Sequence, residues 1–552
     1  MKSLILKILS LIFLITYLSY AQDNPSIAER RRYFNKDLFQ RHLNFLGSDL
    51  FEGRAPGTLG GNLAAKYLAL EFDRLNLIPA GDNGTFYQNI PFHGNKPLIT
   101  SKLNISFEEE NINFRLYEDF LLYQTGEPVF IPVSTPIVFA GYGIVAPEFD
   151  YNDYQGIDVS GKIVVFIEGE PLSLDSSYFN GNNPTIYSTA EAKQRIALSR
   201  GAKGSILIPN VNANRYFDWT KQVSSFSFEN LSLAYSASSS FDIMLNPYVA
   251  DILFMESGYS LNDIFKMCIS YSMKSFPLKV QLTFRGEFIQ RDFISPNIIG
   301  VLPGEDDELK DEYVIVSAHY DHLGIGHEVK GDSIYNGVLD NAMGVSAVLE
   351  LARVIKQYNM PHNRSLVFIL TTGEESGLLG SGYYVKNPVF PLYKTVANVN
   401  IDGISSFDEF KNVIGIGSEY STMQDFLSVV ASERNLSLAQ VPQEFSNFES
   451  FSKSDQHSFA KAGIPSILIY EGLDYVNTGK DEGLRTMIKY SSEIYHTPFD
   501  DLSLPINYDA ATQHMEILLS IIQNLVNDKS EPEWYSGSPF INERLISTAE
   551  KR

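Results

Sequence analysis

The stretch Tyr313-Val-Ile-Val-Ser-Ala-His-Tyr-Asp-His322 decides the fold class, because a buried strand runs directly into polar side chains. Its first six residues are rich in Val and Ile and apolar on both faces, which is typical of parallel strands buried between layers of helices. Four similar runs lie outward from it, at 298–302, 366–370, 396–401 and 466–470. A helical face over 345–355 separates two of these strands. This alternation predicts an α/β fold with a doubly wound, mostly parallel sheet and helices on both faces.

Acidic and histidine side chains gather where these strands end. In a doubly wound sheet, the functional site lies beyond the carboxyl ends of the strands. The strand ends and the start of the helix carry five of the candidate residues, and the sixth follows later: His319, Asp340, Glu374, Glu375, Asp402 and His496. Carboxylates packed that closely repel one another unless cations neutralise them, so the arrangement predicts a metal site.

The residue types indicate zinc as the metal. Imidazole nitrogen and carboxylate oxygen together suit zinc, and the single Cys268 excludes a Cys-rich site and an intramolecular disulfide framework. Two histidines and three acids are too many ligands for one tetrahedral ion. They fit two ions about 3.5–4 Å apart if one carboxylate bridges them. We therefore expect two zinc ions per chain.

The motifs around these residues resemble the two-zinc metallo-aminopeptidase family (aminopeptidase Y type, co-catalytic zinc exopeptidases). The resemblance spans about Ser48 to Val526. Its matching segments are His319-Tyr-Asp-His322, Asn336-Gly-Val-Leu-Asp-Asn-Ala-Met-Gly344, Gly373-Glu-Glu-Ser-Gly-Leu-Leu-Gly-Ser381, Asn400-Ile-Asp402, Ser454-Asp-Gln-His-Ser-Phe459 and Tyr495-His-Thr497. The resemblance implies a zinc exopeptidase-like fold and an unusual cis peptide after Asp340.

The resemblance also implies a role for each ligand. One zinc is held by His319 and Asp402, the other by Glu375 and His496, and Asp340 bridges the two. Family members often carry a second acid where Leu339 stands here, and we expect this departure to have a minor effect on metal binding.

Seven further residues are interpreted around these ligands. The resemblance implies that Glu374 is the general base and Tyr495 an oxyanion stabiliser. Asp321 follows His319 by two residues and is interpreted as orienting its imidazole. Asp455 and His457 either shape the substrate pocket or form structural hydrogen bonds. His322 and His327 are expected in loop or supporting positions rather than as ligands.

The middle of the chain is predicted to form a smaller, β-rich inserted domain over residues 131–290. Strand signals at 136–140, 162–167 and 204–208, with a helix over 190–199, resemble the protease-associated (PA) domain. The alternative is that this stretch belongs to one larger α/β domain. The flanking ranges are then assigned as the N-terminal part of the peptidase domain, the catalytic domain and a C-terminal tail: 22–130, 291–528 and 529–552.

The first residues read as a secretory signal peptide. Lys2 and Lys7 precede an apolar run over 8–18, and small residues lead to a cleavage point after Ala21, so residues 1–21 are predicted to be removed. The alternative is an N-terminal anchor, but the run is too short to span a bilayer. We therefore expect an exported protein, periplasmic or secreted, without a stable membrane anchor after cleavage. With 43 Lys+Arg against 66 Asp+Glu, the net charge of −23 argues against a nucleic-acid partner.

The favoured function is a zinc-dependent aminopeptidase that uses a two-zinc-bound hydroxide and acts on peptides with a free amino terminus. Acidic ligands around the reacting carbonyl attract a substrate α-ammonium, whereas a terminal carboxylate needs a cationic anchor. Arg54 or Arg485 could supply that anchor from elsewhere in the chain. The alternatives are a carboxypeptidase or dipeptidase on the same scaffold, a one-zinc aminoacyl cyclase, and a metal-free binding homologue. Retention of both histidines and all three acids argues against the last two.

Overall fold

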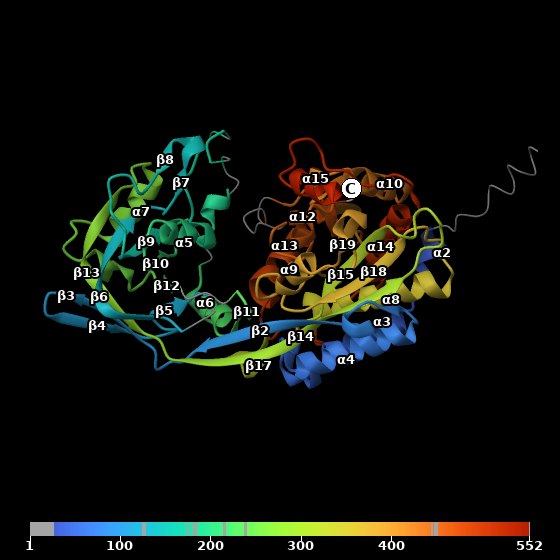
Figure 1. The fold of residues 1–552 in the computed structure, drawn as a ribbon, viewed down its shortest axis with the longest axis horizontal. Coiled ribbons are helices and arrows are strands. Elements are labelled where there is room, and N and C mark those ends of the chain that lie inside the picture. Colours follow the sequence, from blue (N-terminus) through green and yellow to red (C-terminus); the bar gives the residue numbers. More distant parts are fainter. Residues whose placement is uncertain are drawn as a thin grey trace, which may run out of the picture.

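The protein has two lobes. The computed structural model describes residues 27–550 apart from short gaps at 124–127, 174, 176, 180, 182–184, 214–216, 237–239, 443–444 and 446–450. Figure 1 shows the lobes side by side, joined along one edge by the long strands β2 (Tyr87–Pro97) and β14 (Phe288–Leu302). The expected signal peptide lies outside the described residues and stays a prediction. No helix in the described part of the chain is long and apolar enough to cross a membrane.

The larger lobe is built on a ten-stranded sheet in the order β11-β2-β14-β18-β15-β19-β22-β20-β21, with β1 paired to β14. Its other strands are β1 (Ile78–Pro79), β11 (Asn230–Leu233), β15 (Tyr313–His319), β18 (Ser365–Thr371), β19 (Thr395–Asn400), β20 (Asn412–Ile416), β21 (Ser437–Ala439) and β22 (Ser466–Glu471). The central strands β18, β15, β19 and β22 run parallel. They include four of the five strands that the sequence predicts.

The fifth predicted strand, 298–302, is the second half of β14, and the expectation that it runs parallel is wrong. β14 runs antiparallel to both β18 and β2, and its register with β2 extends from Phe288 opposite Pro97 to Ile298 opposite Tyr87. The chain leaves the larger lobe along β2 and returns along β14, so the two strands have opposite directions. Burial on both faces identifies a central strand but does not reveal its direction.

Helices cover both faces of the larger sheet, as the doubly wound fold requires. Val314 and Val316 of β15 join a core with α3, α4, α8 and α14, while Ile315 faces the opposite core with α9 and α12. The helices of this lobe are α2 (Ile27–Arg31), α3 (Lys36–Leu46), α4 (Leu59–Arg74), α8 (Met343–Gln357), α9 (Leu379–Lys386), α10 (Met423–Glu433), α12 (Gln456–Lys461), α13 (Lys480–Lys489), α14 (Tyr508–Asn527) and α15 (Ile541–Ala549).

The smaller lobe has its own eight-stranded sheet, in the order β4-β3-β13-β6-β9-β10-β12-β5, and its own apolar core. The strands signalled at 136–140, 162–167 and 204–208 and the helix over 190–199 are confirmed. The elements of this lobe are β3 (Lys102–Phe107), β4 (Glu110–Phe114), β5 (Phe120–Leu122), β6 (Phe130–Ala140), β9 (Ile163–Ile167), α5 (Ala190–Ser199), β10 (Gly204–Ile208), α6 (Trp219–Phe226), β12 (Phe241–Leu245), α7 (Leu261–Ile269) and β13 (Ser275–Arg285).

The strand pairing differs from the expected domain boundary at residue 131. β3 pairs with β13 and β5 pairs with β12, so the smaller sheet already takes in residues from Lys102 onward. Conversely, β11 lies within the expected range 131–290 but pairs with β2 at the edge of the larger sheet. These pairings join residues far apart in the sequence, which local strand signals do not record. The resemblance of this lobe to a PA domain stays a prediction.

The segment 219–233 ties the two lobes together beside a loop of the larger lobe. Lys221 on α6 donates through its Nζ to the backbone oxygen of Ser492, and Ser227 Oγ accepts the His327 N–H at 3.3 Å. Glu229 then forms an ion pair with Arg291 on β14, at 2.5 Å between oxygen and nitrogen. Through these contacts the smaller lobe touches the residues that precede His496 in the chain.

The start of α4 packs against the preceding segment without room for a side chain. Thr58 caps this helix by accepting the Gly61 N–H on its Oγ1 at 3.1 Å. A Cβ added to Gly60 lies 1.7 Å from the backbone oxygen of Phe51, and one added to Gly61 lies 2.3 Å from that of Ala55. Real atoms cannot approach so closely, so both glycines are required for this packing.

We predict that Gly60→Ala destabilises the protein by about 1–3 kcal/mol, because the backbone at Phe51 must move to admit the methyl group. Gly382→Ala on α9 is the matched control, since nothing lies within 4 Å of its added Cβ. We expect the control to leave stability unchanged or to raise it by up to about 1 kcal/mol. Thermal unfolding of both variants measures the difference, and equal midpoints would contradict the close packing.

Candidate metal centre

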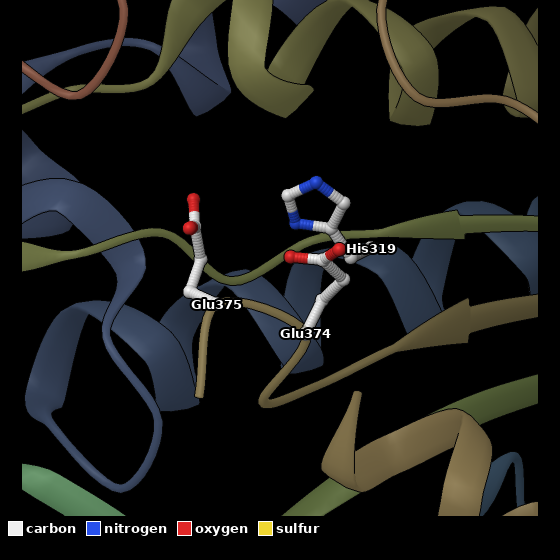
Figure 2. Close-up of side chains that lie close together, drawn as sticks. All are labelled: His319, Glu374 and Glu375. Atoms are coloured by element: carbon white, nitrogen blue, oxygen red, sulfur yellow. The ribbon is translucent and has the colours of Figure 1, made fainter. Parts of the chain in front are cut away.

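The predicted ligands converge at the carboxyl edge of the larger sheet. His319 is the last residue of β15, and Glu374 and Glu375 follow β18. Asp402 lies two residues after β19, and Asp340 lies in the turn η6 (Val338–Ala342) that leads into α8. Figure 2 shows Glu374 and Glu375 next to each other, with His319 beside Glu374, and one ligand atom from each of the three lies within 4.8 Å of the others.

Asp340 lies between the two histidines, and each of its carboxylate oxygens faces a different imidazole. His319 Nε2 is 3.1 Å from Asp340 Oδ1 and 3.2 Å from Asp402 Oδ1. His496, which follows the turn η9 (Tyr490–Ile494), has its Nε2 3.1 Å from Asp340 Oδ2 and 3.0 Å from Glu375 Oε2. The side chains therefore fall into two groups that share Asp340.

These separations fit the donor spacing around a bound cation. Ligand atoms about 2.0–2.2 Å from a tetrahedral zinc ion lie about 3.4 Å from one another. The distances of 3.0–3.2 Å between imidazole nitrogens and carboxylate oxygens are close to that value in both groups. The donors are nitrogen and oxygen only, which suits zinc among the common metals. The residues present therefore fit a pair of zinc ions.

The pKa values of the acids separate into two kinds. Burial raises the pKa of Glu375, but His496 and His322 outweigh burial and lower it to about 2. The pKa of Asp340 likewise falls well below its usual value, because hydrogen bonds with His319 and His496 outweigh burial. These two carboxylates therefore stay ionised, as metal ligands must.

Glu374 behaves in the opposite way. Burial raises its pKa well above the usual value, and the negative charges of Asp402 and Glu375 add to that shift against the lowering effect of His319. A carboxylate whose pKa is raised binds a proton more readily than an ordinary glutamate. This property suits a group that accepts a proton and then releases it again.

The supporting residues divide by location. Asp321 is fully buried, its Oδ1 accepts the Glu374 N–H at 3.3 Å, and its backbone oxygen lies 3.1 Å from His319 Nδ1. Asp455 is also fully buried, and its Oδ2 accepts the Thr371 hydroxyl at 2.5 Å at the end of β18. His457 packs edge-on against Phe451 and Phe540, with ring centroids 5.5 and 6.2 Å away. This location of His457 fits the structural alternative.

Three further residues contribute to the centre, and the roles of two of them, Asp500 and Arg54, were not predicted from the sequence. His322 was expected in a supporting position, and its Nδ1 lies 2.5 Å from Glu375 Oε1. Asp500 accepts backbone N–H groups from the turn that carries Asp340. Arg54 donates to backbone carbonyls of the same turn. Contacts of Asp500 and Arg54 with backbone atoms leave no residue pattern in the sequence. The expected cis peptide between Asp340 and Asn341 is present.

The two arginines that could have anchored a substrate carboxylate are occupied elsewhere. Arg54 is 1% exposed and donates to four backbone oxygens, those of Leu46, Tyr320, Asn336 and Gly337. The side chain of Arg485 is exposed and forms an ion pair with Glu482 on α13 at 2.7 Å. Four of the five N–H donors of Arg54 are therefore committed to backbone oxygens.

Residues 297–522, which carry all of these predicted ligands, match the model of Peptidase family M28. This match confirms the family resemblance. Among curated proteins, the chain is 25% identical over 240 residues to Aminopeptidase YwaD of Bacillus subtilis, covering 43% of this chain and 46% of that protein. It is 26% identical over 198 residues to the Vacuolar membrane protease of Candida albicans, covering 36% of this chain and 21% of that protein.

The chain thus spans no more than half the length of these two relatives. Among solved structures, the aminopeptidase from Aneurinibacillus sp. strain AM-1 aligns over 91% of this chain and 98% of its own, with 18% identity and a TM-score of 0.55. The alignment extends over most of both lobes and confirms the α/β fold class.

We predict that Asp340→Ala loses metal from both halves of the centre, because each carboxylate oxygen serves a different histidine. Metal content by elemental analysis, with unfolding temperature measured with and without a chelator, tests this. Metal at 100 times its Kd stabilises a protein by about 2.7 kcal/mol. The chelator should therefore lower the unfolding midpoint of the wild-type protein and leave that of Asp340→Ala unchanged. The control is Asp307→Ala, an exposed acid paired with Lys310. Full metal content in Asp340→Ala would contradict the shared position of this side chain.

Proposed function

We propose that this chain is a zinc-dependent aminopeptidase that holds two zinc ions. The observation that carries the proposal is the position of Asp340, whose two oxygens face His319 and His496 separately. In this proposal His319 and Asp402 hold one ion, Glu375 and His496 hold the other, and Asp340 is shared. The similarity of residues 297–522 to peptidase family M28 supports the same reaction class.

Bound zinc supplies Lewis-acid polarisation of the scissile carbonyl and a lowered pKa for an attacking water. The chain's own residues then handle the protons. Glu374 takes a proton from the attacking water while the water oxygen forms a bond to the carbonyl carbon. Glu374 then gives that proton to the leaving amine as the carbon–nitrogen bond breaks. Burial beside other acids supports this role, since it raises the pKa of Glu374 well above the usual value.

Tyr495 is proposed to stabilise the oxyanion that develops on the substrate carbonyl. Its ring stacks on His496 with a centroid distance of 3.8 Å, and the residue is 45% exposed. The stacking fixes the ring beside a ligand while its exposure leaves it accessible to a substrate. A hydroxyl donor held in advance of the reaction stabilises charge that appears only in the transition state.

The amino end of a peptide fits this centre better than the carboxyl end. Glu374 and Asp402 surround the reaction position with negative charge, which attracts an α-ammonium group. A carboxypeptidase needs a cation near the same position, and the donors of Arg54 are taken up by backbone oxygens. Peptides with a free amino terminus are therefore the proposed substrates.

We predict that Glu374→Gln keeps both metals and loses kcat by about 10²–10⁴-fold, as expected when a general base is removed. The amide has nearly the same shape but cannot accept the proton. Glu328→Gln, an exposed acid on the strand β16 (Gly324–Val329), is the control and should retain full activity. Steady-state kinetics and metal analysis are measured on the same samples. Loss of zinc with retained activity in metal-replete buffer would reverse the assignments of base and ligand.

We predict that N-acetylation of a peptide abolishes its cleavage, whereas C-amidation leaves cleavage almost unchanged. The acetyl group removes the positive charge that the acidic centre attracts, and amidation removes a negative charge that these acids do not attract. The readout is mass spectrometry of the released residues. Cleavage that survives acetylation and is lost on amidation would identify a carboxypeptidase, and ring closure of a free amino-terminal residue would identify a cyclase.

A further inference from the structure

The turn 336–340, which consists of the two residues before η6 and the start of η6 as far as Asp340, is held by charged side chains on both its carbonyl and its amide groups. Its backbone oxygens at Asn336 and Gly337 accept hydrogen bonds from Arg54. Its backbone N–H groups at Leu339 and Asp340 donate to the carboxylate of Asp500. Consecutive peptide units are therefore fixed from two sides by groups of opposite charge.

Each of the three oxygens of Asp500 accepts a hydrogen bond from this turn. Its Oδ1 accepts the Leu339 N–H at 2.8 Å and its Oδ2 accepts the Asp340 N–H at 3.0 Å, while its backbone oxygen accepts the Val338 N–H at 3.1 Å. Asp500 is fully buried and follows His496 by four residues. The loop that supplies one histidine thus also holds the shared acid. Only the backbone of Leu339 takes part, so the departure from the family pattern at this position does not disturb the contact.

Arg54 holds the other side and reaches a further ligand-bearing segment. Its Nη1 donates to Asn336 O at 2.6 Å, its Nη2 to Gly337 O at 2.9 Å, and its Nε to Tyr320 O at 2.8 Å. Tyr320 directly follows His319, so one guanidinium links both segments. Burial lowers the pKa of Arg54 to about 10, and the negative charge of Asp500 acts against that shift.

The backbone that delivers Arg54 is itself unusual. Gly53 and Arg54 have φ angles of +69° and +56°, and Glu52 before them has +47°. Such angles are uncommon for residues other than glycine and persist where surrounding contacts over-determine them. A Cβ at Gly53 would lie 2.3 Å from Tyr335 O, so the segment must approach the turn closely.

We infer that Arg54 and Asp500 are positioning residues that hold the turn 336–340 so that the two oxygens of Asp340 face two metal ions. This inference rests on the proposed function. Neither side chain faces the reaction position, because their polar atoms are committed to backbone groups. Charge-assisted hydrogen bonds of this kind are about twice as strong as neutral ones, and partners that orient a ligand typically change metal affinity by about 10–100-fold.

The test compares Asp500→Asn with Asp501→Asn, the same change at the next residue. Asparagine keeps one acceptor oxygen and replaces the other with an NH₂ group, so one of the two N–H contacts is lost. The carboxylate of Asp501 serves Ser503 instead, accepting its N–H at 2.8 Å and its hydroxyl at 2.5 Å. Arg54→Lys is the second variant, because it keeps the charge but loses the fork that spans several carbonyls.

Two readouts separate positioning from general stability. The first is zinc affinity, measured by competition with a chromogenic chelator, which should fall about 10–100-fold in Asp500→Asn and Arg54→Lys and stay unchanged in Asp501→Asn. The second is hydrogen exchange of the segment 336–342 in metal-free protein, followed by mass spectrometry. The exchange rate of this segment should increase in both variants, while the exchange rates of β15 and β18 should equal those of the wild-type protein.

Each outcome decides the inference. Zinc affinity unchanged in Asp500→Asn overturns it, even if activity falls. Faster exchange throughout the larger lobe overturns it as well, because Asp500 then acts on stability in general. If the wild-type protein binds no zinc, the proposed function is wrong. Faster exchange confined to 336–342 would in that case leave Asp500 as a structural residue of the turn, and the positioning role for metal would be overturned.

Discussion

Mutual repulsion among buried carboxylates is the constraint on which the rest of the structure depends. Asp340, Glu374, Glu375 and Asp402 meet at one edge of the sheet, where Asp340 and Glu374 are buried and the other two are partly buried, so little water screens their charges. Three imidazoles, those of His319, His322 and His496, lie within 3.2 Å of these acids and account for the lowered pKa of Asp340 and Glu375. Glu374 differs because neighbouring acids and burial dominate over His319 at its position. The same cluster thus combines carboxylates that stay ionised with one that binds a proton more readily, as the proposed roles of ligand and general base require.

The fold keeps these acids together by mounting them on elements that cannot move independently. β18, β15 and β19 pair in parallel through the middle of the sheet, so the residues that follow them lie side by side. The turn at Asp340 has no such sheet pairing and is fixed by Arg54 and Asp500 through its backbone. The loop at His496 has a third source of order, because Lys221 of the smaller lobe bonds the backbone at Ser492. The smaller lobe therefore contacts the loop that leads to His496.

The sequence was sufficient for the features that depend on local patterns. Apolar runs on both faces predict the central strands, and polar residues directly after them, such as His319, predict which side chains converge at the edge of the sheet. The direction of β14 could not be predicted, because it follows from the path of the chain through the smaller lobe. Arg54 lies 266 residues before Tyr320 in the sequence, and the atom of Tyr320 that it contacts is the backbone oxygen. Any residue type presents a backbone oxygen, so no pattern of side chains marks this contact.

The geometry also bears on the choice between one metal ion and two. A centre that needs one ion needs one complete ligand group, and the remaining acids are then free to drift apart or to pair elsewhere. Here both groups are equally tight, with His319 at 3.1 and 3.2 Å from its acids and His496 at 3.1 and 3.0 Å from its own. Asp340 takes part in both, so a shift that improves one group weakens the other. This shared position of Asp340 supports the proposed pair of ions over a single ion, because one carboxylate can bridge two ions through its two oxygens.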